Sequence, residues 1–131
     1  MLGTSPFAKQ WGAAAVNAPG AWTLIDGTAY VGVNDNGMQG GHEDFSDITY
    51  GSAFKQQFAI NVAPSTGYTS DVDELAGTPQ YQYAGHGTHV SGVIAARHNG
   101  IGAAGICKGC SLMIAKIGQN GFPIAGAAGL S

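Results

Sequence analysis

Charged side chains are scarce in this chain, and their scarcity excludes some classes of partner. Asp, Glu, Lys and Arg together make up 10% of the 131 residues, against roughly 25% in an average soluble domain. The five Lys and Arg residues are scattered and the net charge is −3, so no basic stripe is available to bind nucleic acid. The sequence also lacks an uninterrupted apolar run of about 18 residues, so we expect no membrane-spanning segment.

Cysteine occurs only twice, at Cys107 and Cys110, which form a Cys-x-x-Cys pair. This spacing is found in redox motifs and in half of a zinc site, but no second cysteine pair is present to complete a zinc site. The interpretation that we favour is a local disulfide in a secreted protein. A redox motif is the alternative.

Glycine and apolar residues, by contrast, are abundant. The 22 glycines, against an average usage of about 7%, indicate many tight turns and close backbone contacts. Hydrophobic residues make up 44% of the chain, which is enough to form a core and argues against disorder. The length allows one domain at most. Low charge with many glycines is typical of an extracellular enzyme with surface loops. It is also compatible with a fragment from which the surface that it packs against has been removed.

The apolar pattern predicts an α/β fold. Residues 29–34 form a run that is apolar on both faces up to its last residue, as expected of a buried parallel strand. Further strands are expected at 58–62 and 112–117, and a helix rich in small residues at 88–97. Strands that alternate with helices favour a mostly parallel sheet. Residues 64–83 are rich in Gly, Ser, Thr, Pro and acids, which indicates a surface loop.

The most informative segment is Gly-His-Gly-Thr-His-Val at 85–90, which places His86 at the start of the predicted helix. Fifty-one residues earlier, the first apolar strand ends in Asp35, followed by Asn36 and Gly37. An acid that ends a strand and a histidine that opens a helix are two parts of an Asp-His-Ser relay. In such a relay His86 takes the proton of a serine hydroxyl, and Asp35 holds the imidazole in the correct tautomer. The glycines beside His86 are expected to leave room for a substrate backbone.

These segments resemble the aspartate and histidine motifs of the subtilisin-like serine proteases, the subtilases. The resemblance covers residues 10–45 and 85–122, including the opening Gln-Trp-Gly and the His-Glu-Asp-Phe at 42–45. Asn36 stands where most members have Ser or Thr; related branches carry Asp there, so we expect the replacement to be tolerated. The 39 residues of 46–84 make a longer segment than the short bacterial members have there.

The resemblance implies a fold, an activity and a partner. The expected fold is the N-terminal portion of a subtilisin-like, doubly wound, mostly parallel sheet flanked by helices. Residues 1–131 would be an incomplete catalytic domain, because the Gly-Thr-Ser-x-Ala segment that carries the nucleophile does not occur. The implied function is a secreted serine endopeptidase, free or at the cell surface, that cleaves proteins or peptides. The chain alone is expected to be inactive without the remainder of the domain, since it lacks the serine and the oxyanion-binding Asn.

The resemblance also implies a structural calcium ion, with no cofactor for catalysis. The loop after the histidine helix and the segment around Asp44 supply oxygen ligands in many members, and hard oxygen donors are what calcium requires. An ordinary turn at Asn99-Gly100 is the alternative. The corresponding positions here are the side chains of Asp44 and Asn99 and the carbonyl groups of Arg97, Ile101 and Ala103.

Substrate contacts are implied at 118–122, where Gly118 and Gly121 would belong to an exposed edge along which a peptide lies antiparallel. Two other functions compete with the protease. One is a non-catalytic binding or adhesion module that retained the fold. The other is a metal site formed by His86 and His89, although the family pattern makes His89 a packing and hydrogen-bonding residue.

The acids of the longer segment allow a further cation site. Asp71, Asp73 and Glu74 lie close together in sequence. A solvated acidic loop is the interpretation that we favour for them.

Overall fold

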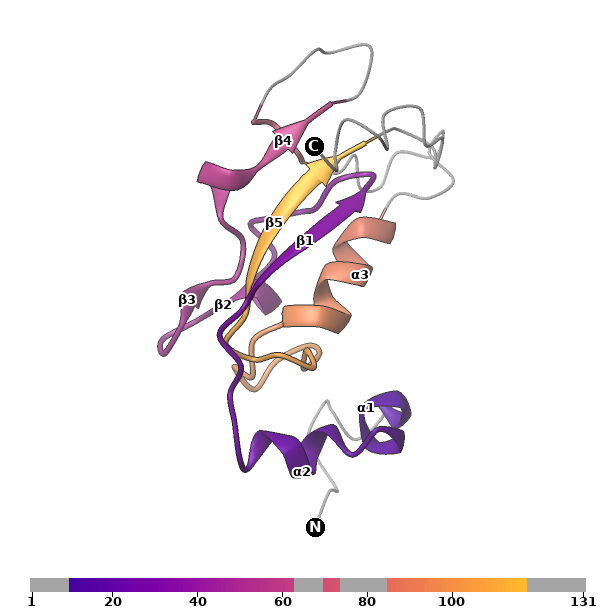
Figure 1. Cartoon of the computed structure of the whole chain (residues 1–131), viewed down its shortest axis with the longest axis vertical. Coiled ribbons are helices and arrows are strands. Elements are labelled where there is room, and N and C mark those ends of the chain that lie inside the picture. The colour runs from indigo at the N-terminus through magenta and orange to yellow at the C-terminus, as the bar shows by residue number, and fades with distance from the viewer. Residues whose placement is uncertain (1–9, 63–69, 74–84, 118–131) are drawn as a thin grey trace.

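A computed structural model describes residues 10–62, 70–73 and 85–117 (Figure 1). Its elements, in chain order, are α1 (Trp11–Ala15), α2 (Ala18–Trp22), β1 (Tyr30–Asp35), the 3-10 turn η2 (Glu43–Phe45), β2 (Ser46–Asp47), β3 (Gly51–Ser52), the 3-10 turn η3 (Gln56–Phe58), β4 (Ile60–Asn61), α3 (His86–Ala95) and β5 (Ser111–Lys116). None of the helices among these residues is both long and apolar enough to cross a membrane.

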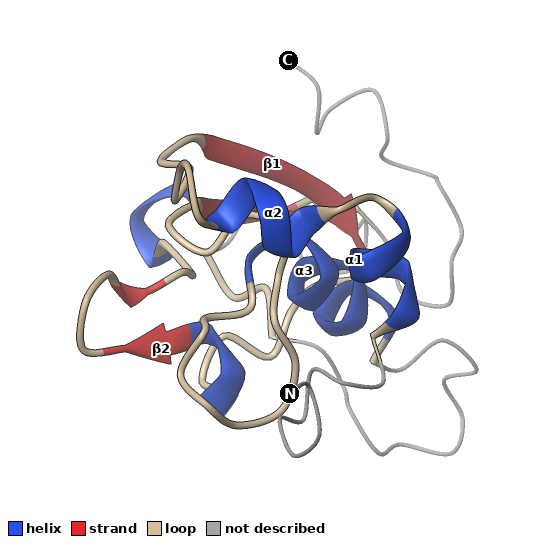
Figure 2. Ribbon diagram, turned by 90° about the horizontal axis from the view of Figure 1, so that it is seen from below, coloured by secondary structure: helices blue, strands red, loops and turns tan. Residues whose placement is uncertain are grey.

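The central feature is a parallel sheet with strand order β1-β5-β4. β1 and β5 pair over their full length, from Tyr30 opposite Ser111 to Asp35 opposite Lys116. α3 packs along one face of these two strands (Figures 1 and 2). This arrangement confirms the predicted α/β class with a mostly parallel sheet. It also puts the carboxyl end of β1 and the beginning of α3 at the same end of the molecule.

The strands and the helix lie close to the predicted positions, with one clear difference. The expected strand at 58–62 is reduced to the two residues of β4, because η3 ends at Phe58 just before it. The helix begins at His86, two residues earlier than the pattern indicates, and ends at Ala95.

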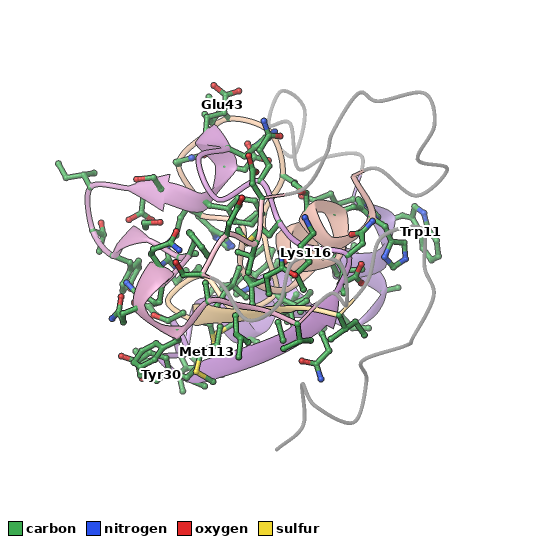
Figure 3. All side chains as sticks on the ribbon, turned by 90° about the horizontal axis from the view of Figure 1, so that it is seen from above. Trp11, Tyr30, Glu43, Met113 and Lys116 are labelled. Atoms are coloured by element: carbon green, nitrogen blue, oxygen red, sulfur yellow. A yellow bond between two sulfur atoms is a disulfide. The ribbon has the colours of Figure 1, made fainter. Side chains whose placement is uncertain are left out.

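The expectation that the first strand is buried on both faces is wrong for the part of the chain described here. Val33 is 5% exposed and faces the core, whereas Tyr30 is 59% exposed, and Gly32 and Asn34 are also exposed. The Tyr30 ring lies on the outer face, edge-on to Phe58 (Figure 3). The reason is that α3 covers one face only and β1 stands at the end of the described sheet. Parallel sheets in complete domains are usually covered on both faces.

The core between α3 and the sheet holds an unexpected charge. Its apolar part includes Phe45, Leu112 and Ile114, each 2% exposed or less. Arg97 follows α3 and is 1% exposed, yet its guanidinium donates hydrogen bonds to the carbonyl oxygens of Gly51, Lys108 and Cys110. Burial lowers the pKa of this guanidinium. These contacts tie the β2–β3 turn region to the loop before β5.

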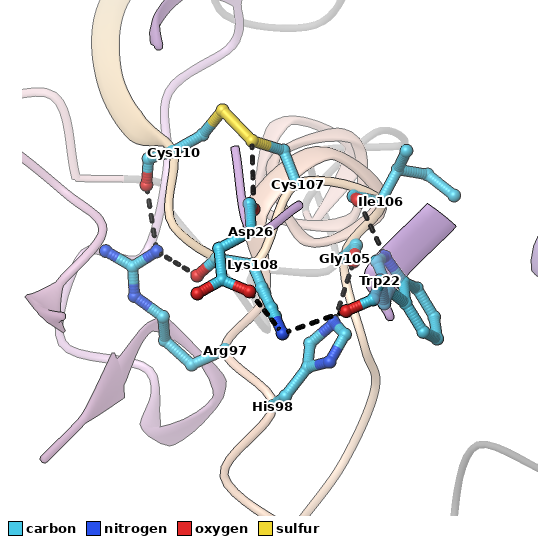
Figure 4. The surroundings of a disulfide bond; sticks show 9 residues. All are labelled: Trp22, Asp26, Arg97, His98, Gly105, Ile106, Cys107, Lys108 and Cys110. Atoms are coloured by element: carbon cyan, nitrogen blue, oxygen red, sulfur yellow. Dashed lines mark hydrogen bonds and ion pairs between the residues drawn. A yellow bond between two sulfur atoms is a disulfide. The ribbon is translucent and has the colours of Figure 1, made fainter. Parts of the chain in front are cut away.

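That loop also contains a disulfide between Cys107 and Cys110 (Figure 4). Beside it, the Lys108 ammonium pairs with the Asp26 carboxylate at 2.5 Å, and the Tyr50 hydroxyl donates to the same carboxylate. The bond from Lys108, with a smaller effect from Tyr50, lowers the pKa of Asp26. The bond to Asp26 raises the pKa of Tyr50. The cluster fixes the entry to β1 against the entry to β5.

Candidate active site

The carboxyl end of β1 presents an acid at the edge of the sheet. Asp35 is its last residue, and its side chain is 14% exposed. Its Oδ1 accepts the N–H of Asn36 at 2.8 Å, and its main-chain carbonyl accepts the N–H of Ile117 after β5. The backbone ladder and the local turn therefore fix the direction of the carboxylate. Ligand and active sites in open α/β sheets gather at this edge.

The first residue of α3 faces that acid. His86 Nδ1 lies 2.8 Å from Oδ1 and 2.9 Å from Oδ2 of Asp35. The expectation that these groups lie within hydrogen-bond reach is confirmed. Because a carboxylate only accepts, the contact places a proton on Nδ1, and in the neutral imidazole Nε2 is then the acceptor. The His86 side chain is 55% exposed, so a reacting group can approach it.

Two hydrogen bonds join the loop after Asp35 to the beginning of α3. The side chain of Asn36 accepts the N–H of Gly87 at 2.9 Å, and the hydroxyl of Thr88 accepts the N–H of Gln39 at 2.9 Å. The first bond satisfies one of the backbone donors that every helix leaves unpaired at its N-terminus. The family resemblance predicts only that Asn36 is a tolerated replacement. The bond joins residues that are 51 positions apart, and the only signal in the sequence is a polar residue next to the motif aspartate.

The two glycines beside His86 are explained by backbone geometry. Gly85 has φ of +90°, a left-handed conformation that favours glycine. Gly87 lies so close to the loop that a Cβ there would overlap the carbonyl oxygen of Gly37. The expected reason, room for a substrate, is thus not needed to account for either residue. They allow α3 to approach β1 closely enough for the Asp35–His86 contact.

Hydrogen bonds bring the positions proposed for calcium to the η2 turn, which contains Asp44. Asp44 is 9% exposed, and its Oδ2 accepts the N–H of Ala103 at 2.9 Å. Its Oδ1 is buried and has no hydrogen-bond partner among the described residues. The main-chain N–H of Arg97 donates to the carbonyl oxygen of Asp44. An unpaired buried carboxylate oxygen is a group that a cation would satisfy.

Asn99 has a second role in the same loop. Its amide donates to the carbonyl oxygens of Glu43 and Ser46, each at 3.0 Å, and its Oδ1 accepts the N–H of Ile101. The side chain therefore joins the loop after α3 to the η2 turn. Among the described residues, no group of three or more His, Cys, Asp or Glu side chains is arranged to hold a metal ion. A cation here would depend on Asp44 together with amide and carbonyl oxygens.

The other predicted residues are not all brought to this edge. His89 is exposed and lines, with His42, a cavity of about 420 Å³ on the side of Asp44. Asp71 and Asp73 are exposed, and Asp71 Oδ1 accepts the N–H of Asp73. The remaining predicted positions, Glu74, Gly118 and Gly121, lie outside the described residues.

Comparison with known proteins gives one family. The model of the subtilase family matches residues 26–127, well over half of the chain. Thermitase from Thermoactinomyces vulgaris is 29% identical over 114 residues, which is 86% of this chain and 34% of thermitase. The chain thus spans about a third of the length of this curated relative.

Proposed function

Because this chain belongs to the subtilase family of serine peptidases, we propose that Asp35 and His86 are the acid and the base of an endopeptidase that cleaves proteins or peptides. The observation that carries the proposal is the double contact of His86 Nδ1 with the Asp35 carboxylate, at 2.8 and 2.9 Å. A solvated surface pair would not require the hydrogen bond from Gly87 N–H to Asn36 and the close approach of Gly87 to the buried Gly37 to hold it.

The geometry supports a general-base role for Nε2. Asp35 accepts a hydrogen bond from Nδ1–H, so in the neutral imidazole the lone pair is on Nε2, the ring nitrogen that faces away from the carboxylate. Nε2 would take the proton from a serine hydroxyl as that oxygen attacks the scissile carbonyl. The resulting imidazolium is stabilised by Asp35 and returns the proton to the leaving amine.

The nucleophile and the oxyanion-binding Asn would come from the remainder of the catalytic domain. Ser91, in α3, is fully buried and cannot reach a substrate. Tyr30 and Asn34 are exposed on the outer face of β1, and this is where we expect that remainder to pack. The chain by itself would then not hydrolyse peptides, because stabilisation of the oxyanion is commonly the largest catalytic contribution.

We also propose a structural calcium ion bound by Asp44. The unpaired Oδ1 of this buried carboxylate supports the proposal, and the carbonyl groups of Arg97, Ile101 and Ala103 with the side-chain oxygen of Asn99 would complete the ligand set. The ion would stabilise the loop after α3 and take no part in bond cleavage. The disulfide between Cys107 and Cys110 supports the proposal that the protein is secreted, because disulfides persist in oxidising compartments.

The proposed activity is tested by His86→Ala in the intact protein, with His89→Ala as the matched control. His86→Ala should lower kcat by several orders of magnitude, since members of a catalytic triad act as a unit. Folding should change little because the His86 side chain is 55% exposed. His89→Ala removes a second exposed imidazole of the same helix and should leave kcat near normal.

Two outcomes would refute the assignment. Near-normal turnover of the His86→Ala protein would remove His86 from the mechanism. A parent protein that binds peptides and does not cleave them would favour a binding module that retained the fold.

A further inference from the structure

A buried lysine stands next to the Asp35–His86 pair, and the proposed chemistry does not use it. Lys116 is the last residue of β5, in register with Asp35 on β1. Its side chain is labelled in Figure 3. Lys116 is 5% exposed. Burying an ammonium group is costly unless it is hydrogen-bonded. An apolar side chain of similar length would fill the same space without that cost, so the charge calls for a role beyond packing.

The ammonium of Lys116 binds the segment 70–73. Its Nζ donates to the carbonyl oxygen of Asp73 at 2.6 Å. The same segment is held at two other points: the carbonyl of Val72 accepts the N–H of Met38 at 2.9 Å, and the amide of Gln56 donates to the carbonyl of Ser70 at 2.7 Å. Val72 itself is 3% exposed and belongs to the core. The segment is thus fixed against the loop that follows Asp35.

That loop is confined from two sides. On one side, the carbonyl of Gly37 packs directly against Gly87 of α3. On the other side, a Cβ on Gly37 would overlap the carbonyl oxygen of Val72 and would lie 3.3 Å from Cδ of Lys116. Lys116 and segment 70–73 therefore form a wall behind the loop, and α3 forms the opposite wall. Without the first wall, the loop and Asp35 could move away from His86.

We propose that Lys116 is a positioning residue for the Asp35–His86 pair: its ammonium fixes segment 70–73 against residues 36–38 and so holds the Asp35 carboxylate on His86 Nδ1. The inference rests on the proposed function for its effect on turnover. The effect on the Asp35–His86 geometry is independent of the proposed function, because that geometry can be observed without catalysis.

The test compares Lys116→Met with Lys55→Met in the intact protein. Lys116→Met preserves most of the buried side-chain volume and removes the ammonium. Lys55 also donates its Nζ to a main-chain carbonyl, that of Ser52 at 2.8 Å, so its replacement controls for the loss of such a bond elsewhere. The direct readout is the low-field proton resonance of His86 Nδ1–H, which depends on the hydrogen bond to Asp35.

In Lys116→Met this resonance should broaden or disappear, and in Lys55→Met it should persist. If the proposed function holds, kcat should also fall by about ten- to 100-fold in Lys116→Met, since a displacement of about 1 Å can have an effect of that size. KM should change by less than about twofold, because the effect falls on the reacting groups rather than on binding.

Gln56→Ala keeps the test decisive if Lys116→Met does not fold. Gln56 is exposed and holds the same segment through Ser70. Its replacement should therefore broaden the resonance and lower kcat as in Lys116→Met, but to a smaller extent. An unchanged resonance in both Gln56→Ala and a folded Lys116→Met would overturn the proposal. So would an unchanged resonance in Gln56→Ala when Lys116→Met is unfolded. Loss of the resonance in a protein that proves not to be a peptidase would support the positioning role and refute only the proposed activity.

Discussion

Gly87 offers the sharpest single perturbation of the site, because one methyl group there would meet backbone atoms. In Gly87→Ala the new Cβ would overlap the carbonyl oxygen of Gly37, and would lie 2.9 Å from Asn36 Oδ1 and 3.1 Å from the carbonyl carbon of Gly37. Contacts under 3 Å to backbone cannot be relieved by rotating a side chain. The beginning of α3 must therefore move away from the loop after β1.

The displacement has two consequences of different size. Overpacking of this kind costs typically about 1–3 kcal/mol of unfolding free energy. A shift of about 1 Å in the position of His86 relative to Asp35 can lower kcat by about 100-fold. Moving α3 away from the loop also breaks or lengthens the hydrogen bond from Gly87 N–H to Asn36 Oδ1, which is 2.9 Å long in the parent. We expect the loss in turnover to exceed what partial unfolding of the variant could explain.

The assay is kcat and Tm of the intact protein, with Gly92→Ala as the matched control. Gly92 lies in the same helix, and among the described residues nothing lies within 4 Å of a Cβ built there. Replacing an unobstructed glycine in a helix interior by Ala should stabilise the protein by about 0.5–1 kcal/mol. The two substitutions should thus shift Tm in opposite directions, and only Gly87→Ala should lower kcat.

A Gly87→Ala protein with the stability and turnover of the parent would refute the reasoning. It would mean that α3 and the loop can separate without moving His86 from Asp35. The close approach would then be an incidental feature of the packing.

Two further predictions concern parts of the molecule away from the pair. Millimolar calcium should raise Tm of the intact protein by mass action, and Asp44→Asn should abolish the increase; a parent Tm that does not respond to calcium would contradict the cation site. The lowered pKa of Asp26 means that its ionised form favours the folded state above the ordinary value of 3.8, and that this contribution is lost as pH falls through the lower folded-state value. Asp26→Asn should therefore weaken the dependence of the unfolding free energy on pH in the acid range, measured by chemical denaturation; equal slopes for parent and variant would show that the pairs with Lys108 and Tyr50 do not favour folding.

The elements that sequence predicts best are those whose signal is local. The strand that ends in Asp35 is a continuous apolar run, and the helix after it has glycine at its start and small residues throughout. Both fall within one or two residues of their predicted ends. The strand at 58–62 is shorter than predicted because η3 occupies Phe58. Nothing in the composition of this segment indicates that turn.

The contacts that sequence misses are long-range and polar. The sequence predicts Arg97 as the end of a helix and a carbonyl ligand, whereas its burial depends on three carbonyl oxygens supplied by β3 and by the loop before β5. Asn36 looked like a tolerated substitution, and its role depends on an N–H 51 residues away. Such partners are set by the tertiary fold, which pattern and propensity do not encode. Each could have been suspected only as a polar residue in an otherwise apolar or motif-bearing segment.

The Asp35–His86 contact follows from the topology more than from the residues between its partners. β1 and β5 are parallel, so the chain between them must return to the end where β1 began, and α3 makes that return. The carboxyl end of β1 and the N-terminus of α3 therefore meet at one edge of the sheet whatever the length of the segment 46–84. What the fold leaves open is the last few ångströms. The close approach of Gly87 to Gly37 and the hydrogen bond from Gly87 N–H to Asn36 bring the beginning of α3 to within hydrogen-bond distance of Asp35. A long intervening segment is therefore compatible with an intact Asp35–His86 pair.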